Sequence, residues 1–335
     1  MTSLTFNPLS NIAHGEIKDC VAYIAGALIT IHGPDPHWSE SAFELVEGLL
    51  ALLLEDPKRE ASLPNFRSIL TEPYGELAKI AMETEEMPED SIARRKLARF
   101  ADPDLGEKKE LCSIISTAIT QTAFLDDPDL SKFLTSTTPG FSLDCLTEEG
   151  DGATIYLILP FDKLKSHSRW LRLMLSLAIR TVFRSSNKRK DHVLFLLDEF
   201  GNIGPLPAIS SALSMGAGRN ILLWIFVQSL VQLKHDYQDE WELFIANSDH
   251  MQFFDIMAEF TADYVSKLLG PKTISFAHNQ HYSRDLLQAS EIRRLSNKYG
   301  ILINCGEKPV LYEKITYYND PLFAGLARKD PKYSE

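Results

Sequence analysis

The chain has 335 residues, 44% of them apolar and 24% charged, which is enough for one large or two medium globular domains. Its net charge of -12 excludes a surface that grips nucleic acid over its whole extent, because phosphate binding needs clustered Lys and Arg. Four cysteines without a CxxC pair argue against a zinc site or a disulfide framework. No apolar run reaches the ~18 residues of a membrane span, and no signal peptide is recognisable, which predicts a cytoplasmic location.

The first half of the chain predicts helices. Residues 1–15 hold one remnant strand, at 3–8, which Asn7-Pro8 stops. From 16 to 150 apolar residues recur at helical spacing, as in the segment from Trp38 to Leu53, and no β pattern interrupts them. We therefore predict an all-α subdomain over 16–150.

The pattern changes at residue 151. Apolar, β-rich runs alternate with helical segments up to residue 325, and a polar tail covers 326–335. Such alternation predicts βαβ units with a mostly parallel sheet, and the unbroken apolar character of the strands predicts that both sheet faces are covered. The main strands are expected at 153–159, 192–197, 220–227 and 252–254, with a closing hairpin at 301–304 and 310–312.

Polar residues follow three of these strands. Asp198 and Glu199 end the run HVLFLL, Gln228 follows LLWIFV, and Asp255 follows the short strand after it. Ligands of parallel sheets bind at the carboxyl ends of the strands, so these positions predict a binding edge.

The Asp-Glu pair after an apolar strand has the form of a Walker B motif. Asp198 is suited to hold Mg²⁺ through water, and Glu199 to polarise the attacking water as a general base. Taken alone the pair is a weak signal, because a solvated cap after a strand has the same residues.

Two further residues fit the same chemistry. Gln228 can sense a γ-phosphate or orient water, or it can simply satisfy backbone groups at a strand end. Arg219, in the loop MGAGRN, can reach a phosphate in a neighbouring subunit as an arginine finger, or it is an exposed loop residue.

The stretch LFLLDEFGNIGPLPAISSALSMGAGRNILLWIFVQSLVQLKHDY resembles the core of the TraG/TraD/VirD-type type IV coupling proteins. FFDIMAEFTADYVSKLLG resembles the next strand and helix of that family, and FNPLSN and ATIYLILPFDKL resemble its upstream segments. These proteins are RecA-like hexameric ATPases of the FtsK/HerA class that dock DNA–relaxase complexes or effector proteins onto type IV secretion systems.

The resemblance implies a role for each matching residue. Asp198 and Glu199 match the Walker B pair, Gln228 matches the glutamine after the next strand, and Arg219 falls in a loop where some members keep a basic residue. Asp255 stands where the family more often has a small residue, so we assign it no role. The implied cofactors are ATP and Mg²⁺. The implied partners are the secretion machinery, a relaxosome or effector proteins, further copies of the chain, and DNA in a hexamer channel.

Two departures from the family matter. Neither the N-terminal membrane anchor nor the Walker A loop that precede FNPL in the family is found in these residues. Gly270-Pro-Lys-Thr273 has the last residues of a Walker A motif without its first glycine, and it follows a helix instead of a strand. Without that loop no backbone cradle holds the phosphates. We therefore expect the C-terminal portion of a coupling ATPase, located at the inner membrane through its partners, that binds ATP tightly only when a P-loop is supplied elsewhere.

Two alternatives stay open. The first is an adaptor without ATPase activity that recruits substrates through the all-α subdomain. The second is an unrelated metal-dependent hydrolase, which would need further ligands such as His278 and His281 near the pair. Arg184 and the residues Lys188 to Lys190 form a basic loop, which predicts either a solvated loop or a lining for a hexamer channel.

Overall fold

The computed structural model describes residues 4–10, 12, 14–31, 36–135, 140–148, 152–185, 191–276, 280–323, 325 and 326. Contacts within the chain divide it into two compact units, Met1–Phe226 and Val227–Glu335. Each unit is described by itself. None of the helices in the described residues is both long and apolar enough to cross a bilayer.

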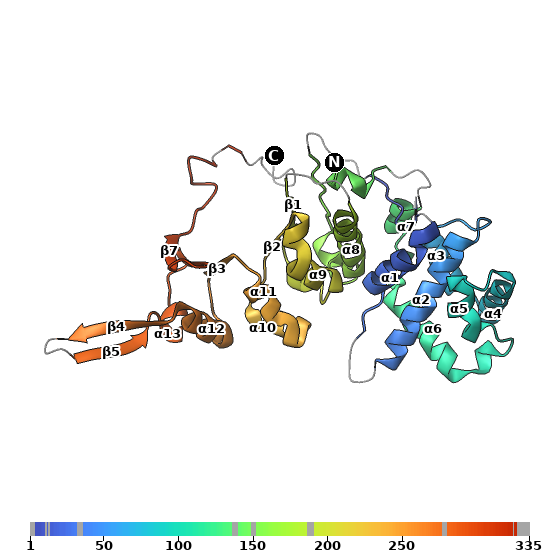
Figure 1. Ribbon diagram of the computed structural model, residues 1–335, viewed down its shortest axis with the longest axis horizontal. Helices are drawn as coiled ribbons and strands as arrows, with labels where there is room; N and C mark the ends of the chain where they lie inside the picture. Colours follow the sequence, from blue (N-terminus) through green and yellow to red (C-terminus); the bar gives the residue numbers. More distant parts are fainter. Residues whose placement is uncertain are drawn as a thin grey trace. The chain divides into compact units, whose positions relative to one another are not determined.

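The first unit begins with a helical region, drawn from blue to green in Figure 1. Its α-helices are α1 (Ile17–Leu28), α2 (His37–Glu55), α3 (Leu63–Leu70), α4 (Tyr74–Glu83), α5 (Ile92–Leu97), α6 (Lys109–Gln121) and α7 (Pro128–Leu134). Short 3₁₀ helices connect them: η1 (His14–Glu16), η2 (Thr84–Glu86), η3 (Ala98–Phe100), η4 (Leu105–Glu107), η5 (Ala123–Asp126) and η6 (Leu143–Leu146). The described residues of 16–148 thus contain helices and loops and no strand, as the apolar spacing predicts.

Helix α2 supplies the centre of this region and contacts α1, α3, α5 and α6. Its residues from Ala42 to Leu53 that follow the helical pattern are at most 2% exposed, whereas Trp38 in the first turn is 38% exposed. Helix α5 approaches so closely that a Cβ atom at Gly48 would lie 2.8 Å from Leu97 Cδ2. A side chain at this position would therefore push the two helices apart.

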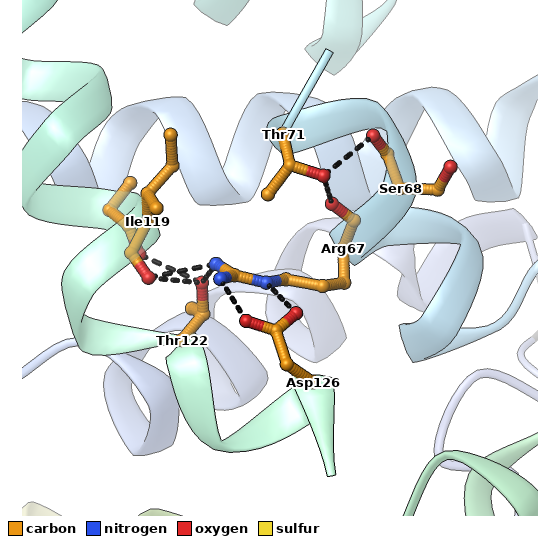
Figure 2. Close-up of polar contacts among 7 residues, drawn as sticks. Arg67, Ser68, Thr71, Ile119, Thr122 and Asp126 are labelled. Atoms are coloured by element: carbon orange, nitrogen blue, oxygen red, sulfur yellow. Dashed lines mark hydrogen bonds and ion pairs between the residues drawn. The ribbon is translucent and has the colours of Figure 1, made fainter. Parts of the chain in front are cut away.

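A buried arginine joins α3 to the end of α6 (Figure 2). The Nε and Nη2 groups of Arg67 donate to the two carboxylate oxygens of Asp126 at 2.8 and 2.6 Å. Its Nη1 group donates to the carbonyl oxygen of Ile119 and to Thr122 Oγ1, both at 2.8 Å. The guanidinium thus satisfies the last turn of α6, where a positive charge also complements the helix dipole. The same contact holds the pKa of Asp126 below its ordinary value.

A second polar junction lies at the start of α7. Asp127 caps this helix, since its Oδ1 accepts from the backbone N–H groups of Asp129 and Leu130 at 3.0 and 3.2 Å. Its Oδ2 accepts from Lys163 Nζ at 2.5 Å. Lys163 belongs to η7 (Phe161–Lys163), so this ion pair joins the helical region to the segment that leads into the sheet.

The sheet of the first unit follows α8 (Ser168–Arg184) and consists of β1 (Val193–Leu197) and β2 (Ile221–Ile225), linked by η8 (Phe200–Asn202), α9 (Pro207–Met215) and η9 (Gly216–Arg219). The two strands are parallel, with Val193 opposite Ile221 and Leu197 opposite Ile225. This is the predicted βαβ unit.

The described residues cover only one face of this sheet, whereas the sequence pattern predicted that both faces are covered. Phe195 and Leu197 are 8% and 6% exposed, whereas Leu194 and Leu196 between them are 51% and 55% exposed. Helix α9 packs against β2 on the buried side and α8 packs against α9. The strands are apolar on both faces, so the sequence pattern alone could not show that the described helices cover only one of them.

Two predicted strands are not formed in the described residues. Residues 4–7 make only isolated backbone hydrogen bonds: the Phe6 N–H donates to the Phe133 carbonyl at 3.0 Å, and the Gly140 N–H donates to the Thr5 carbonyl at 2.8 Å. Residues 153–159 do not form a strand, and the side chains of Tyr156 and Ile158 are 72% and 65% exposed. A strand requires a ladder of hydrogen bonds to a neighbour, and β propensity alone does not supply one.

The second unit holds the elements α10 (Leu230–Tyr237), η10 (Gln238–Trp241), α11 (Glu242–Ala246), β3 (His250–Phe254), α12 (Glu259–Leu269), β4 (Pro271–Phe276), β5 (Gln280–Asp285), α13 (Ala289–Ile292), β6 (Tyr299–Asn304) and β7 (Val310–Glu313). Strands β3, β6 and β7 form one antiparallel sheet, and β4 and β5 form a hairpin. A small core of Ala262, Val265, Ile292 and Ile301 lies between α12, α13 and β6.

The closing hairpin and α12 confirm the sequence prediction, but the prediction for the pairing of β3 was wrong. The βαβ pattern places β3 in a parallel sheet, whereas its ladder is antiparallel to β6. The parallel sheet of the described residues is therefore smaller than predicted. The hairpin of β4 and β5 was not predicted, because the segment from Pro271 to Asp285 is polar and lacks a clear alternation.

We expect Arg67→Ala to lower the free energy of unfolding by about 2 kcal/mol, because it removes charge-assisted hydrogen bonds and leaves the last carbonyls of α6 without a donor. Urea unfolding followed by far-UV circular dichroism measures the change. Lys79→Ala is the control, since Lys79 and Glu76 form an exposed pair whose loss should cost less than ~0.5 kcal/mol. Equal effects of the two substitutions would contradict a structural role for Arg67.

We also expect a pH-dependent contribution from Asp127. The hydrogen bond from Lys163 holds the pKa of this carboxyl well below its usual range, with the backbone N–H of Leu130 adding to the effect. Its contribution is therefore present above the unfolded pKa of about 4 and is lost as the pH falls towards the folded value. The melting temperatures of the parent chain and Asp127→Asn should differ most above pH 5 and converge below pH 4. Asp129→Asn, at an exposed neighbouring position, should give a difference that changes little with pH.

Candidate functional site

The carboxylate pair predicted from the sequence lies at the carboxyl end of β1. Leu197 is 6% exposed, whereas Asp198 and Glu199, directly after it, are both exposed. The backbone of Glu199 is left-handed, with φ 52° and ψ 38°, and its N–H donates to Asp198 Oδ1 at 3.1 Å. A non-glycine residue in this region costs roughly 1 kcal/mol and is uncommon outside functional or tightly determined turns. The turn directs the chain sharply away from the strand immediately after the two carboxylates.

The residues around this turn hold it in place. The Phe200 side chain is 1% exposed, and its N–H donates to the Phe226 carbonyl at 3.2 Å. The Phe226 N–H in turn donates to the Leu197 carbonyl at 3.1 Å. These bonds continue the β1–β2 ladder past the end of both strands. The exposed pair therefore stands between a buried strand and a buried aromatic ring.

Arg172, on α8, fixes the loop that follows the pair. It is 3% exposed, and the partners described for its guanidinium are backbone carbonyl oxygens. Nε donates to Ala27 at 3.2 Å and Nη2 to Gly26 at 3.3 Å, in the last turn of α1. Nη1 donates to Ile203 at 3.4 Å and to Pro205. One buried charge thus ties the first helix of the helical region to the loop after Asp198 and Glu199.

The pair suits Mg²⁺ held mostly by water and does not suit a metal site built from protein ligands alone. Neither carboxylate takes part in an ion pair within the described residues, and the Asn202 amide lies 3.4 Å from Glu199 Oε2. No group of three or more His, Cys, Asp or Glu side chains gathers anywhere in the described residues. Mg²⁺ keeps several waters and needs only one or two carboxylates, so the exposed pair fits it.

The metal-dependent hydrolase considered from the sequence finds no support here. It requires a cluster of ligands around the pair, and the described part of the chain contains none. His278 and the side chain of His281 lie outside the described residues.

Arg219 stands at the opposite edge of the sheet from the pair. It is exposed at the end of η9, two residues before β2 begins. Because β1 and β2 are parallel, Asp198 lies at the carboxyl edge and Arg219 at the amino edge, and a strand of five residues spans roughly 16 Å. A role for Arg219 as an arginine finger therefore requires a neighbouring subunit.

Gln228 and Asp255 belong to the second unit and are described with it. Gln228 is exposed, three residues after β2 ends, and its N–H donates to Gln232 Oε1 at 3.4 Å. Asp255 follows β3 with φ 51°, and its carboxylate accepts from Lys314 Nζ at 2.6 Å. Asp255 thus has an ion-pair partner within its own unit.

The basic loop before β1 is described only at its start. Arg184 is exposed and forms an ion pair with Glu16. Lys188, Arg189 and Lys190 lie outside the described residues, so their predicted place in a solvated loop or a channel stays a prediction.

Comparison with known proteins identifies the family of the chain. A model of the family described as Type IV secretory system Conjugative DNA transfer matches residues 1–334. The chain belongs to this family. A conjugal transfer protein TraG of Escherichia coli is 24% identical over 387 residues, covering 98% of the chain and 59% of the relative. Protein VirD4 of Rhizobium radiobacter is 30% identical over 183 residues, covering 50% of the chain and 27% of the relative. The chain spans about half the length of the curated TraG relatives that it matches, from 42% to 59%.

Solved structures give the same fold. The plasmid coupling protein TrwB in complex with ADP and Mg²⁺ has a TM-score of 0.70 at 14% identity, with 93% of this chain and 72% of that chain covered. An unbound form of TrwB also has a TM-score of 0.70, over 92% of this chain and 70% of that chain. This likeness confirms the fold class predicted from the sequence, a RecA-like α/β fold with an all-α part. The resemblance to type IV coupling proteins is confirmed as well.

We expect the two carboxylates to contribute little to stability. Asp198→Asn and Glu199→Gln should change the free energy of unfolding by less than ~0.5 kcal/mol, because both side chains are exposed and outside any described ion pair. Phe200→Ala, at the neighbouring buried position, should cost about 3 kcal/mol. Urea unfolding of the variants tests the contrast. A large loss in Glu199→Gln would show that the pair is structural.

Proposed function

We propose that this chain is part of a type IV coupling ATPase, in which it recruits DNA–relaxase or effector substrates and couples ATP hydrolysis to their transfer. Membership of the conjugative DNA transfer family supports a role in type IV secretion. The observation that carries the catalytic part is the exposed Asp198-Glu199 pair at the carboxyl end of a parallel strand, on a turn that buried residues hold. TrwB, which shares the fold, has been solved with ADP and Mg²⁺.

The roles proposed for the residues follow from where they stand. Asp198 would hold Mg²⁺ through water, and Mg²⁺ would neutralise charge on the phosphates of ATP. Glu199, one residue further on the turn, would accept a proton from the attacking water. Arg219 would act on the nucleotide of a neighbouring subunit, and Gln228 would orient water or sense the γ-phosphate.

The phosphates need a cradle that these 335 residues do not contain, since no G-x-x-x-x-G-K-[ST] motif occurs in them. We propose that a P-loop from a further segment or another chain completes the site, and that the chain by itself does not bind ATP tightly. The proposed partners are the secretion machinery, a relaxosome or effector proteins, and further copies of the chain, with DNA in a channel of the assembly. The proposed location is the cytoplasmic side of the inner membrane, through these partners.

A second function, an adaptor without ATPase activity, has one observation in its favour. The helical region has a core of its own around α2. In this proposal the helices recruit the substrate and the sheet is a scaffold.

Calorimetric titration with ATP and Mg²⁺ tests the motor proposal. The chain alone should show no tight binding, and micromolar affinity would contradict the proposal. When a P-loop-bearing polypeptide of the family is added, ATP hydrolysis should appear, and Glu199→Gln should lower it by about 10²-fold or more, as loss of a general base does. Glu86→Gln, at an exposed glutamate in η2, is the matched control and should leave the rate unchanged.

The same variants separate the two functions in a transfer assay. The motor requires Glu199, so Glu199→Gln should abolish transfer while leaving substrate capture intact. If transfer survives in this variant, the adaptor is favoured and the role of the carboxylates is refuted.

A further inference from the structure

A small cavity of about 250 Å³ lies in the first unit, where α6 and η5 end and α8 begins. The residues of its wall that matter here are Gln121, Phe124, Asp127, Ser166, His167 and Arg169. The volume is below that of a pocket for a drug-sized ligand and suits a group the size of one amino-acid side chain. The cavity is separate from the carboxylate pair at the end of β1 and has no role in the function proposed above.

The negative charge in this wall already has partners. Asp127 Oδ2 accepts from Lys163 Nζ at 2.5 Å and lies 3.2 Å from His167 Nε2. Ser166 Oγ lies 2.8 Å from His167 Nδ1. This order of groups resembles that of a nucleophilic triad, but the oxygen that would orient the histidine is the one that Lys163 binds. The ion pair thus weakens the charge on which such a triad depends, and we infer no nucleophile.

The positive charge in the wall has no such partner. The Arg169 guanidinium makes no ion pair with any described carboxylate, and its one described hydrogen bond runs from Nη2 to Gln121 Oε1 at 3.2 Å. Its Nε atom is buried without a hydrogen-bond partner. Burial lowers the pKa of Arg169, which shows that the surroundings disfavour its charge. The Arg169 side chain as a whole is half-buried, but its Nε–H group is a buried donor without a partner, and such groups in proteins are normally hydrogen-bonded.

Gln121 does not offset that charge. Its Oε1 also accepts from the backbone N–H of Thr30 at 2.7 Å, and its Nε2 donates to the Thr30 carbonyl at 3.3 Å. The amide is thus held by the end of α1 and presents a neutral oxygen to Arg169. Of the two charged groups in the wall, Asp127 is already paired with Lys163, whereas Arg169 has no described carboxylate beside it.

We propose that this cavity binds a single carboxylate group of a polypeptide, with Arg169 as its counter-ion. A carboxylate would supply the counter-ion that Arg169 lacks among the described residues. A dianion such as phosphate would bring excess negative charge beside Asp127, so a carboxylate is favoured. The carboxylate comes from an acidic side chain or from a C-terminus. Because the cavity joins α6 to α8, its occupant contacts both the helical region and the helix that precedes the sheet.

Nuclear magnetic resonance on the full chain, with the arginine Nε–Hε groups observed directly, tests the proposal. The probes are N-acetylglycine for a C-terminal carboxylate, N-acetylaspartate α-methylamide for a side-chain carboxylate, and N-acetylglycine methyl ester as the neutral control. At least one acid should shift the Arg169 Nε–Hε signal in a saturable manner, and the ester should not. Which acid binds more tightly distinguishes the two sources. Equal binding of the ester, or tighter binding of inorganic phosphate, would overturn the assignment.

Two variants give the matched comparison. Arg169→Gln should weaken binding of the acid at least about tenfold, as expected when charge-assisted hydrogen bonds are lost. Lys165→Gln, which removes an exposed positive charge nearby, should change it less than about twofold. Arg169→Lys keeps the charge without the Nε donor and serves where the glutamine variant does not fold. Unchanged binding in the Arg169 variants would refute the site.

Stability provides an independent readout. Arg169→Gln removes a half-buried charge without a described counter-ion, so the melting temperature of the free chain should stay the same or rise. Addition of the acid should raise the melting temperature of the parent chain but not of this variant. A marked fall for the variant without ligand would show that Arg169 is a structural residue and would overturn the proposal.

Discussion

The first unit depends on one buried guanidinium that binds backbone carbonyl oxygens. Arg172 donates to the end of α1 on one side and to Ile203 and Pro205 on the other, and it is 3% exposed. The last carbonyls of a helix have no partner within the helix and carry its negative dipole end, so a cation there is stabilised without a carboxylate. The helical region and the loop after the strand-end carboxylates are therefore linked through Arg172.

The candidate site combines exposed carboxylates with a backbone that buried neighbouring residues hold in place. Phe195, Leu197 and Phe200 are buried, while Asp198 and Glu199 between the last two are exposed. The left-handed backbone of Glu199 is tolerated because hydrogen bonds on both sides of it fix the turn. Exposed carboxylates on such a base can take up a hydrated magnesium ion without a change in the fold, which is what the proposed function asks of them.

Particular elements show what sequence reasoning could reach. Helix α2 and strands β1 and β2 were predictable because their apolar residues follow a helical period or an unbroken strand pattern over their whole length. The run at 153–159 has the same β-rich composition and yet forms no strand in the described residues, since pairing depends on a neighbour and not on propensity. Asp198 and Glu199 were predictable from their place after β1. Arg172 and Arg169 could not be predicted, because nothing in the local sequence distinguishes either arginine from the other polar residues of a helix.

The family, the helical and α/β regions, the strand-end carboxylate pair and the lack of a Walker A motif in these residues were all predictable before the fold was known, because each depends on residues close together along the chain. Only the fold shows that the described residues leave one face of the β1–β2 sheet exposed, that Arg219 lies at the far edge from Asp198, and that β3 pairs with β6. It also shows that Arg169 borders a cavity with its Nε atom buried and with no described carboxylate beside it. Burial and pairing of this kind are set by segments distant in the chain, such as Gln121 and Arg169 or Ala27 and Arg172, and no local pattern records which of them meet.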